Sequence, residues 1–406
     1  MKNIKGLLIS LIFLWPLIFA PGATADQPSV MGEAAILMDA RTGQILYQKN
    51  AGKQMYPAST TKMLTALIAL QQGNLDDLVT VSAEASVTEG SAVWLKEGEQ
   101  LTLEDLLYAL MLNSANDAAV AIAQHLAGSV EEFNKIMNKK AREWGAKNSH
   151  FINPHGLPDE QHHTTAYDLA VIARQAIQHQ KFTEISGTKT KTITRDNPED
   201  FKYLMNHNRL LWNYDGTIGI KTGYTSIAQQ CIVAAAQRDN RELIVVVLKT
   251  QGQNIWSDTT TLFDYGFNNY QLHKLLDKGE VVGETVVKHS KQSIPLITGE
   301  DVYYNFVVNH QPKIEKKVNL NTPAAPLSKG DVVGQLELYD GKQKLKTVNI
   351  LSNTEVKRPL TTHWWFWGGL VLVGLLIMVI VSKYIFREKK NYKNRVIRRR
   401  KNRNKY

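Results

Sequence analysis

The chain has 406 residues, which predicts two or more domains, and it carries a formal net charge of +10. The charge is unevenly placed, because residues 383–406 hold twelve Lys or Arg residues and one acid, Glu388, which gives +11 and leaves −1 for the rest. A nucleic-acid-binding protein needs its basic residues on a folded face, so this distribution argues against nucleic acid as a partner. The single cysteine, Cys231, excludes an internal disulfide, and its apolar neighbours predict a buried strand residue.

Residues 1–25 have the features of a secretory signal peptide. Two early lysines give the positive start, an apolar core follows, and Ala23-Thr24-Ala25 fits the small-x-small rule for cleavage. Cleavage there would start the mature chain near Asp26. An uncleaved anchor is the alternative, but a proline within the apolar run and the shortness of that run favour cleavage.

Residues 26–275 show strand patterns at both ends and helical patterns between them. The first two strands are expected within residues 33–50, with a turn at Arg41-Thr42-Gly43, and the last three from Gly219 onward. Helices are expected after Ser59, over 102–112, from Asp117 to a stop at Gly128, and over 164–177. Because the last strands follow one another without crossover helices, we predict a mixed α/β domain of roughly 250 residues with a largely antiparallel sheet.

The residue pattern after position 275 predicts a β domain, then a membrane-spanning helix and a basic tail. Residues 276–355 alternate apolar and polar positions, which predicts a small all-β domain, and residues 356–363 form a linker. Residues 364–382 carry no charge and span roughly 28 Å as a helix, enough to cross a bilayer core. The basic tail, 383–406, marks the cytoplasmic side, so we expect a single-pass protein of the cell membrane with its folded body outside. Attraction of the tail to anionic membrane lipid would add to this topology signal.

Ser59 and Lys62 stand three residues apart at the start of a helix that is apolar nearly all round. Positions i and i+3 share a helix face, so the two side chains would project together as a nucleophile and its base. A lysine is a base only when it is neutral, which burial and a nearby cation both favour. The plain alternative is a capping serine beside a solvated lysine. A second Ser-x-x-Lys, at Ser186 and Lys189, lies in a stretch that we expect to be a polar loop.

Two further short motifs occur once each in the chain. Ser114 and Asn116 form a Ser-x-Asn at a break between two predicted helices, and a Lys-Thr-Gly lies in a predicted strand at Lys221, Thr222 and Gly223. Taken alone, the first pair would be helix caps and the lysine a solvated strand residue. In this order after Ser-x-x-Lys, they match a trio found in penicillin-binding proteins and β-lactamases, whose middle motif is given as Ser-Asp-Asn.

The chain resembles the low-molecular-weight penicillin-binding proteins, specifically the serine D-alanyl-D-alanine carboxypeptidases, over roughly residues 30–355. The resemblance rests on the ordered trio and on the stretches "YPASTTKMLTAL", "LMLNSANDAA", "NPHGL", "HHTTAYDLA" and "GIKTGYT". It implies an α/β catalytic domain of the penicillin-recognising, β-lactamase-like type over 26–275 and a β-sandwich-like stalk over 276–355. It also implies a cofactor-free hydrolase of peptidoglycan synthesis that acts on the peptidoglycan stem peptide and is acylated by β-lactam antibiotics.

The resemblance assigns a catalytic role to four of the motif residues. Ser59 would be the acylated nucleophile and Lys62 its base. Ser114 would pass the proton to the departing D-alanine. Asn116 would orient Lys62 and the substrate amide.

The resemblance also implies a substrate-binding strand. Lys221 and Thr222 would hold the terminal carboxylate of the substrate, and Gly223 would let the strand approach the ligand closely. The backbone N–H groups of Ser59 and Tyr224 would form the oxyanion hole.

The chain departs from the family's pattern at two places. Many relatives have a glycine between the Lys-Thr-Gly and the cysteine, whereas this chain has "SIAQQC", which questions the geometry of the turn. Many relatives also end in an amphipathic helix that lies on the membrane. A spanning helix stands here instead, so anchoring should be permanent.

The stretch "HGLPDEQHH" offers a candidate metal cluster. It places His155, His162 and His163 near Asp159 and Glu160. It lacks a familiar ligand spacing such as H-E-x-x-H, and the resemblance explains it as a structural loop, so we expect no metal.

Other activities are possible on the same fold. We expect removal of the terminal D-alanine from stem pentapeptides. A β-lactam-binding sensor would be acylated but would barely turn over, and a transpeptidase would use the same acyl-enzyme. A class A β-lactamase would need a deacylating glutamate, which we cannot place in this sequence.

Overall fold

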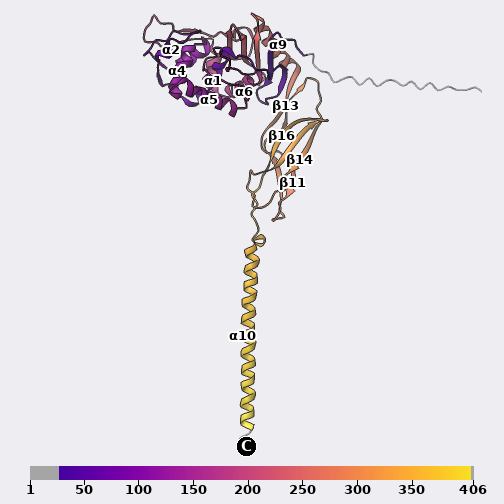
Figure 1. Cartoon of the computed structure of the whole chain (residues 1–406). Coiled ribbons are helices and arrows are strands. Elements are labelled where there is room, and N and C mark those ends of the chain that lie inside the picture. The colour runs from indigo at the N-terminus through magenta and orange to yellow at the C-terminus, as the bar shows by residue number, and fades with distance from the viewer. Residues whose placement is uncertain (1–26, 404–406) are drawn as a thin grey trace, which may run out of the picture. The chain divides into compact units, whose positions relative to one another are not determined.

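A computed structural model describes residues 27–403, so the predicted signal peptide lies outside the described residues (Figure 1). The chain divides into two compact units. The first runs to His273 and includes Tyr304–His310, and the second comprises Lys274–Tyr303 and the chain from Gln311 onward.

The first unit is built on a five-stranded sheet in the order β2-β1-β9-β8-β7. Its strands are β1 (Ala34–Asp39), β2 (Ile45–Lys49), β7 (Thr217–Thr225), β8 (Gln229–Arg238) and β9 (Arg241–Thr250). Strand β1, from the start of the unit, pairs with β9, from its end, and places Ile36 opposite Val246. All four pairings are antiparallel, which confirms the predicted mixed α/β class with an antiparallel sheet.

Alternate residues of the central strands face two different cores, as the two-residue period of a strand requires. Ile36 and Val246 pack in the core formed with the helical layer, whereas Leu37 and Val245 pack in the core that contains residues of α9 (Asn254–Asn269). Both faces of the sheet are therefore covered. Helix α9 is missing from the predicted elements because its three consecutive threonines and Gly266 weaken the helical pattern.

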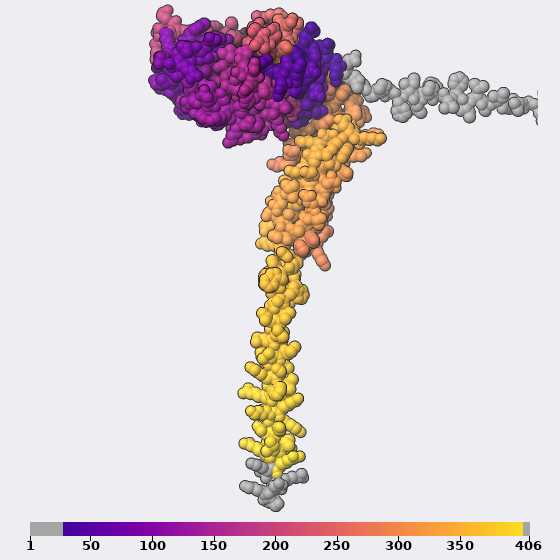
Figure 2. Space-filling view, viewed as in Figure 1, coloured from indigo at the N-terminus to yellow at the C-terminus, as the bar shows by residue number. Residues whose placement is uncertain are grey.

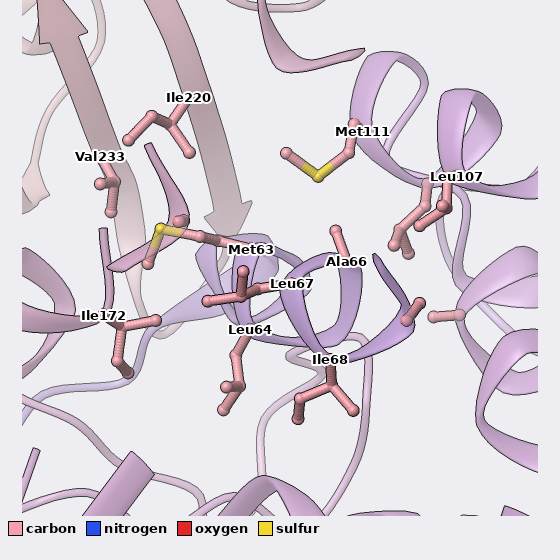
Figure 3. Close-up of a cluster of buried hydrophobic side chains, with 14 of the residues drawn as sticks. Met63, Leu64, Ala66, Leu67, Ile68, Leu107, Met111, Ile172, Ile220 and Val233 are labelled. Atoms are coloured by element: carbon pink, nitrogen blue, oxygen red, sulfur yellow. The ribbon is translucent and has the colours of Figure 1, made fainter. Parts of the chain in front are cut away.

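Helix α1 (Lys62–Gln72) follows the short 3-10 helix η1 (Ala58–Thr61) and lies inside the helical layer. Figure 3 shows its apolar side chains enclosed by side chains from α3, α6, β7 and β8. A helix that is apolar all round must be buried, so the predicted buried helix after Ser59 is confirmed. Burial extends to the one charged residue of α1, Lys62.

The remaining elements of this unit surround α1 and support the site. The helices are α2 (Ala83–Ser86), α3 (Leu103–Leu112), α4 (Asn116–Ala127), α5 (Val130–Glu143), α6 (Ala166–Ala176), α7 (Gln180–Gly187) and α8 (Leu210–Asn213). Two short hairpins are β3 (Leu78–Thr80) with β4 (Gln100–Thr102), and β5 (Thr190–Thr192) with β6 (Tyr203–Met205). Gly128 ends α4 with a φ of 81°, the left-handed conformation that glycine adopts without strain.

The expectation of a polar loop at the second Ser-x-x-Lys is wrong. Ser186 lies in α7 and is fully buried, and its hydroxyl donates to the backbone oxygen of Ile218 at 3.3 Å. Lys189 lies beyond the end of that helix and is exposed. The buried serine is therefore a packing residue, and the pair forms no second nucleophile–base site.

The second unit is dominated by strands, as expected. Five of them form an antiparallel sheet in the order β11-β12-β16-β15-β14. Strands β10 and β13 pair with each other, and each has residues in both units. Their bounds are β10 (Tyr270–Leu276), β11 (Val281–Val286), β12 (Ser293–Thr298), β13 (Val302–Val307), β14 (Ile314–Leu320), β15 (Val332–Asp340) and β16 (Gln343–Ser352). A separate hydrophobic core, which includes Leu296, Leu336 and Ile350, holds the sheet together.

The chain ends in one long helix. Helix α10 (Trp364–Arg403) follows a short 3-10 helix, η2 (Leu360–Thr362). It is long and apolar enough to cross a membrane, and none of its apolar window is buried within the protein, so its side chains stand free in Figure 2. These features are consistent with a membrane anchor. The helix continues beyond the predicted span, through the described part of the basic tail.

Candidate active site

The junction of η1 and α1 brings Ser59 and Lys62 together, as the i, i+3 spacing leads one to expect. Lys62 is fully buried, and its Nζ lies 2.9 Å from Ser59 Oγ. The same Nζ donates to Asn116 Oδ1 at 2.6 Å and to the backbone oxygen of His155 at 2.8 Å. Both of these oxygens can only accept, so in a neutral lysine they take the two N–H groups. The lone pair of the amine is then left for the hydroxyl of Ser59.

The break between α3 and α4 carries the Ser-x-Asn motif to the same place. Ser114 adopts a left-handed φ of 61° and lines a cleft together with Ser59. Asn116 is the first residue of α4, and its Nδ2 donates to the backbone oxygen of Glu89 at 2.6 Å. Since Nδ2 is used in this way, Oδ1 must face Lys62. The orientation of the amide is thus set by bonds at both of its ends.

Strand β7 carries the Lys-Thr-Gly motif past the start of η1. Lys221 is buried and its Nζ donates to the backbone oxygen of Thr222 at 3.0 Å, whereas Thr222, Gly223 and Tyr224 line the cleft. A Cβ atom at Gly223 would lie 2.6 Å from the backbone nitrogen of Ser59, a distance that real Cβ contacts do not reach. Glycine is therefore required for the strand to approach Ser59 this closely.

Burial lowers the pKa values of both lysines. Burial lowers the pKa of Lys62 well below its ordinary value, and the positive charge of Lys221 lowers it further. Burial also lowers the pKa of Lys221 to about 7. Burial and then the nearby lysines lower the pKa of His207, at the cleft, to about 4. The lowered pKa favours the neutral amine of Lys62, the form that can accept a proton.

The cleft has a volume of about 590 Å³ and reaches beyond the three motifs. Lys62, Lys221 and Asn116 lie behind its wall rather than on it. Its further lining comes from β6, from α8 and from the start of α9, and it includes Met205, His207, Arg209, Trp212 and Trp256, none of which the sequence motifs point to. Among the described residues that line the cleft, none is acidic.

The histidine-rich loop packs against α1. The backbone N–H of Ile152 donates to Nδ1 of His162, so the neutral ring carries its proton on Nε2 and donates it to Thr61 Oγ1 at 3.0 Å. Burial lowers the pKa of His162 to about 3. Within residues 27–403, no group of three or more His, Cys, Asp or Glu side chains is arranged to hold a metal. His162 is therefore a structural histidine of the loop.

The same loop supplies a contact that sequence reasoning missed. The backbone oxygen of His155 accepts from Lys62 Nζ, and the backbone oxygen of Pro154 accepts from Thr65 Oγ1 at 2.6 Å. The next residue, Gly156, has a φ of 91°, and a Cβ there would lie 1.8 Å from the backbone oxygen of Ala58. The only signal in the sequence is the "NPHGL" stretch, whose glycine permits this close approach.

The turn after Lys-Thr-Gly is made without the glycine that many relatives have. Gln229 adopts a left-handed φ of 55° at the start of β8, and the backbone N–H of Ala228 donates to Thr225 Oγ1 at 3.0 Å. The buried Cys231 follows, and burial raises the pKa of its thiol to about 12. This chain therefore makes the turn with Gln229 in the left-handed conformation, and Gly223 still lies against Ser59.

Comparisons with known proteins agree with this geometry. The sequence pattern of the D-alanyl-D-alanine carboxypeptidase family (Peptidase S11) matches residues 22–252, and that of the penicillin-binding protein 5 C-terminal domain matches residues 270–358. The D-alanyl-D-alanine carboxypeptidase DacF of Bacillus subtilis is 34% identical over 377 residues, which cover 88% of this chain and 95% of DacF.

Solved structures extend the similarity to the fold. Penicillin-binding protein 5 from Haemophilus influenzae shares 30% sequence identity and superposes with a TM-score of 0.75 over 83% of this chain and 100% of its own. A mutant of a Streptomyces DD-transpeptidase shares 33% identity with a TM-score of 0.57, covering 60% of this chain and 100% of its own. The chain therefore belongs to the serine-type D-alanyl-D-alanine carboxypeptidase family, among the low-molecular-weight penicillin-binding proteins.

Proposed function

We propose that the protein removes the terminal D-alanine from peptidoglycan stem pentapeptides through an acyl-enzyme on Ser59. The observation that carries the proposal is the buried amine of Lys62, 2.9 Å from Ser59 Oγ, with acceptor-only oxygens on its other two sides. This arrangement gives the serine a base at neutral pH. The names of the relatives, which are D-alanyl-D-alanine carboxypeptidases, support the same reaction.

Acylation would begin as Ser59 Oγ attacks the carbonyl carbon of the penultimate D-alanine and its proton passes to Lys62 Nζ. The oxyanion would accept from the backbone N–H groups of Ser59 and Tyr224, and each such donor typically lowers a barrier by about 3 kcal/mol. The C–N bond then breaks. Lys62 returns the proton through Ser114 Oγ to the amine of the departing D-alanine, which leaves an ester on Ser59.

Binding of the terminal carboxylate is the proposed role of Lys221 and Thr222. A carboxylate beside Lys221 favours the protonated amine, so the substrate would raise the lowered pKa of this lysine as it binds. After D-alanine leaves, a water molecule would add to the ester carbon, and Ser59 Oγ would depart with a proton. The products are a shortened stem peptide and the free enzyme, without a metal or cofactor.

β-Lactam antibiotics would enter the same pathway. Ser59 would open the cyclic amide and form an ester, but the nitrogen that leaves remains attached to the acyl group through the rest of the ring. It would then stay in the cleft and hinder the attack of water. We therefore expect a long-lived adduct on Ser59.

The domain and membrane assignments follow from the same proposal. Residues 26–275 would form the catalytic domain and 276–355 a stalk. The linker 356–363 would lead to a span over 364–382. The tail 383–406 would lie in the cytoplasm near anionic lipid, and the catalytic domain would face the cell exterior.

The direct test is release of D-alanine from a stem pentapeptide by the full chain in detergent, with Ser59→Ala alongside. Release by the first protein and not by the second is the expected result. Release by Ser59→Ala would overturn the assignment of the nucleophile. No release by either protein, with a stable penicillin adduct on the unmutated chain, would favour a sensor or a transpeptidase.

Transpeptidation is the second candidate activity. The similarity to a Streptomyces DD-transpeptidase over 60% of the chain favours it, because that reaction uses the same acyl-enzyme and replaces water with an amine. Adding an acceptor amine to the assay distinguishes the two, since a transpeptidase forms a new amide product. A class A β-lactamase mechanism is disfavoured, because the described lining of the cleft contains no glutamate to activate water.

A further inference from the structure

A row of exposed apolar side chains leads away from the cleft. It consists of Met205, Tyr203, Phe201 and Trp94, which we call the rim row. Met205 lines the cleft that contains Ser59, and Tyr203 lies two residues before it on β6, on the same face, with the buried Leu204 between them. Phe201 packs edge to face against Trp94, with ring centroids 5.2 Å apart. Trp94 is 65% exposed and Tyr203 58%.

The loop that carries Trp94 is fastened to the first turn of α4. The backbone N–H groups of Val93 and Leu95 donate to the carboxylate of Asp117 at 3.1 and 3.0 Å, and both of these side chains are buried. Trp94 between them has a left-handed φ of 56° and points out. Asp117 directly follows Asn116, so the ring of Trp94 is held at a set position relative to Ser59.

A buried arginine joins the two segments of the rim row. Arg195 donates through Nε and Nη2 to both oxygens of Glu99 at 2.7 Å, and its side chain has no exposure. Its remaining N–H groups donate to the backbone oxygens of Val93 at 2.7 Å, Phe201 at 2.9 Å and Trp94 at 3.1 Å. A buried charge is tolerated only when it is paired and hydrogen-bonded, so Arg195 locks these segments in one arrangement.

The result is a rigid apolar surface that is open to solvent. Exposed apolar groups that lie together usually mark a binding surface, because leaving them in water is unfavourable. Rings that are already held in place lose little freedom when a ligand binds, which favours affinity. The opposite strand of the hairpin adds hydroxyl groups, since Thr190 pairs with Met205 and Thr192 with Tyr203, and both threonines are exposed.

We propose that the rim row binds the glycan strand to which the stem peptide is attached. This inference rests on the proposed function, because it takes the peptide in the cleft as its starting point. Hexose rings present apolar C–H faces that stack on aromatic rings, while their hydroxyl and acetamide groups suit the threonine hydroxyls. Met205 belongs both to the rim row and to the lining of the cleft. This continuity is needed because the glycan is covalently linked to the peptide that lies in the cleft. At the edge of the rim row, Lys96 pairs with Asp200 at 2.6 Å.

The test compares two substrates on the full chain in detergent. One is a free pentapeptide that ends in D-Ala-D-Ala, and the other is the same pentapeptide carried on glycan strands. We expect Trp94→Ala and Tyr203→Ala each to raise KM about tenfold for the glycan-carried peptide, the usual effect of truncating a buried aromatic contact. The free peptide should react as before. Tyr167→Ala is the matched control, because Tyr167 is an exposed aromatic residue of α6 that does not line the cleft.

The other possible results also test whether the rim row binds glycan. If KM rose equally for both substrates, the mutation would have disturbed the loop. If KM for the glycan-carried peptide did not change, the rim row would not bind glycan. Either result would overturn the inference. Trp94→Phe keeps a ring and should restore most of the effect. If neither substrate releases D-alanine, the proposed function fails separately. Binding of peptide-free glycan strands, lost in Trp94→Ala, would still support the rim row, and no binding would refute it.

Discussion

Replacing Asn116 with aspartate should stabilise the protonated form of Lys62 and so weaken it as a base. The two side chains are nearly isosteric, and the atom that changes charge lies 2.6 Å from Lys62 Nζ. At that distance and an effective dielectric constant of about 20, two unit charges attract by about 6 kcal/mol. Two costs offset part of this attraction: the new carboxylate is buried, and its second oxygen faces the backbone oxygen of Glu89, to which Asn116 Nδ2 donates. We expect a net gain of about 3 kcal/mol for the protonated lysine, which raises the pKa of Lys62 by about two units.

The rate of acylation reports this change. A pKa higher by about two units lowers the neutral fraction of Lys62 by at most about 100-fold at a given pH. Asn116→Asp should therefore be acylated by a fluorescent penicillin more slowly at pH 7, by up to about 100-fold. Raising the pH should restore the rate, because the loss is one of protonation. The measurement is the acylation rate of the full chain in detergent between pH 6 and pH 10.

Asn116→Ala separates charge from orientation. It removes the hydrogen bond that Lys62 donates to Asn116 and adds no charge, so it should slow acylation without moving the pH profile upward. An Asn116→Asp profile that matches the unmutated protein would refute the idea that a neutral Lys62 is the base. Slowing by Asn116→Asp that no pH relieves would point to a lost geometry instead.

Three other measurements address neighbouring parts of the site. Gly223→Ala places a Cβ 2.6 Å from the backbone nitrogen of Ser59, so η1 must shift and the acylation rate should fall about 100-fold or more. Gly52→Ala is the control, because the space around Gly52 is open and its acylation rate should be unchanged. Gln229→Gly relieves a left-handed φ of 55° and should raise the unfolding free energy by about 1 kcal/mol, seen as a Tm higher by a few degrees; an unchanged Tm would contradict this. Because the pKa of Lys221 is about 7, this lysine loses its charge as the pH rises through 7. The KM for a peptide with a free carboxylate should therefore rise between pH 6 and pH 8, whereas the KM for the C-terminal amide of the same peptide should stay constant. If the two KM values changed in parallel, Lys221 would not bind the carboxylate.

Local geometry explains which contacts the sequence could predict. Ser59 and Lys62 meet because three residues make almost one helical turn, whatever the rest of the fold does. The antiparallel order of the last three strands is equally local, since short turns leave no room for a crossover helix. The approach of Lys221 to Lys62 spans more than a hundred residues, and only the resemblance of the ordered motifs indicated it.

Other contacts lacked any signal in the residue types. The oxygen that His155 offers to Lys62 belongs to the backbone, and every residue has one. Arg195 bonds to Glu99, which is distant in the sequence, and to three backbone oxygens, and no short sequence motif predicts these contacts. Helix α9 was missed for a different reason, because packing against the sheet outweighs the weak helix propensity of its threonines.

The neighbouring residues Asn116 and Asp117 show how the fold keeps Lys62 neutral. A carboxylate facing Lys62 would stabilise its protonated form, and Asp117 is close enough in the chain to supply one. The oxygens of the buried Asp117 accept from the backbone N–H groups of Val93, Leu95 and Ala118 instead of contacting Lys62. The charge of Asp117 still raises the pKa of Lys62, but by less than burial and Lys221 lower it. The amide of Asn116 takes the place beside the lysine, where it accepts a hydrogen bond without adding charge. The first turn of α4 therefore directs the neutral group to the base and the charged group to the loop of Trp94, and Asn116→Asp tests whether the base needs a neutral neighbour.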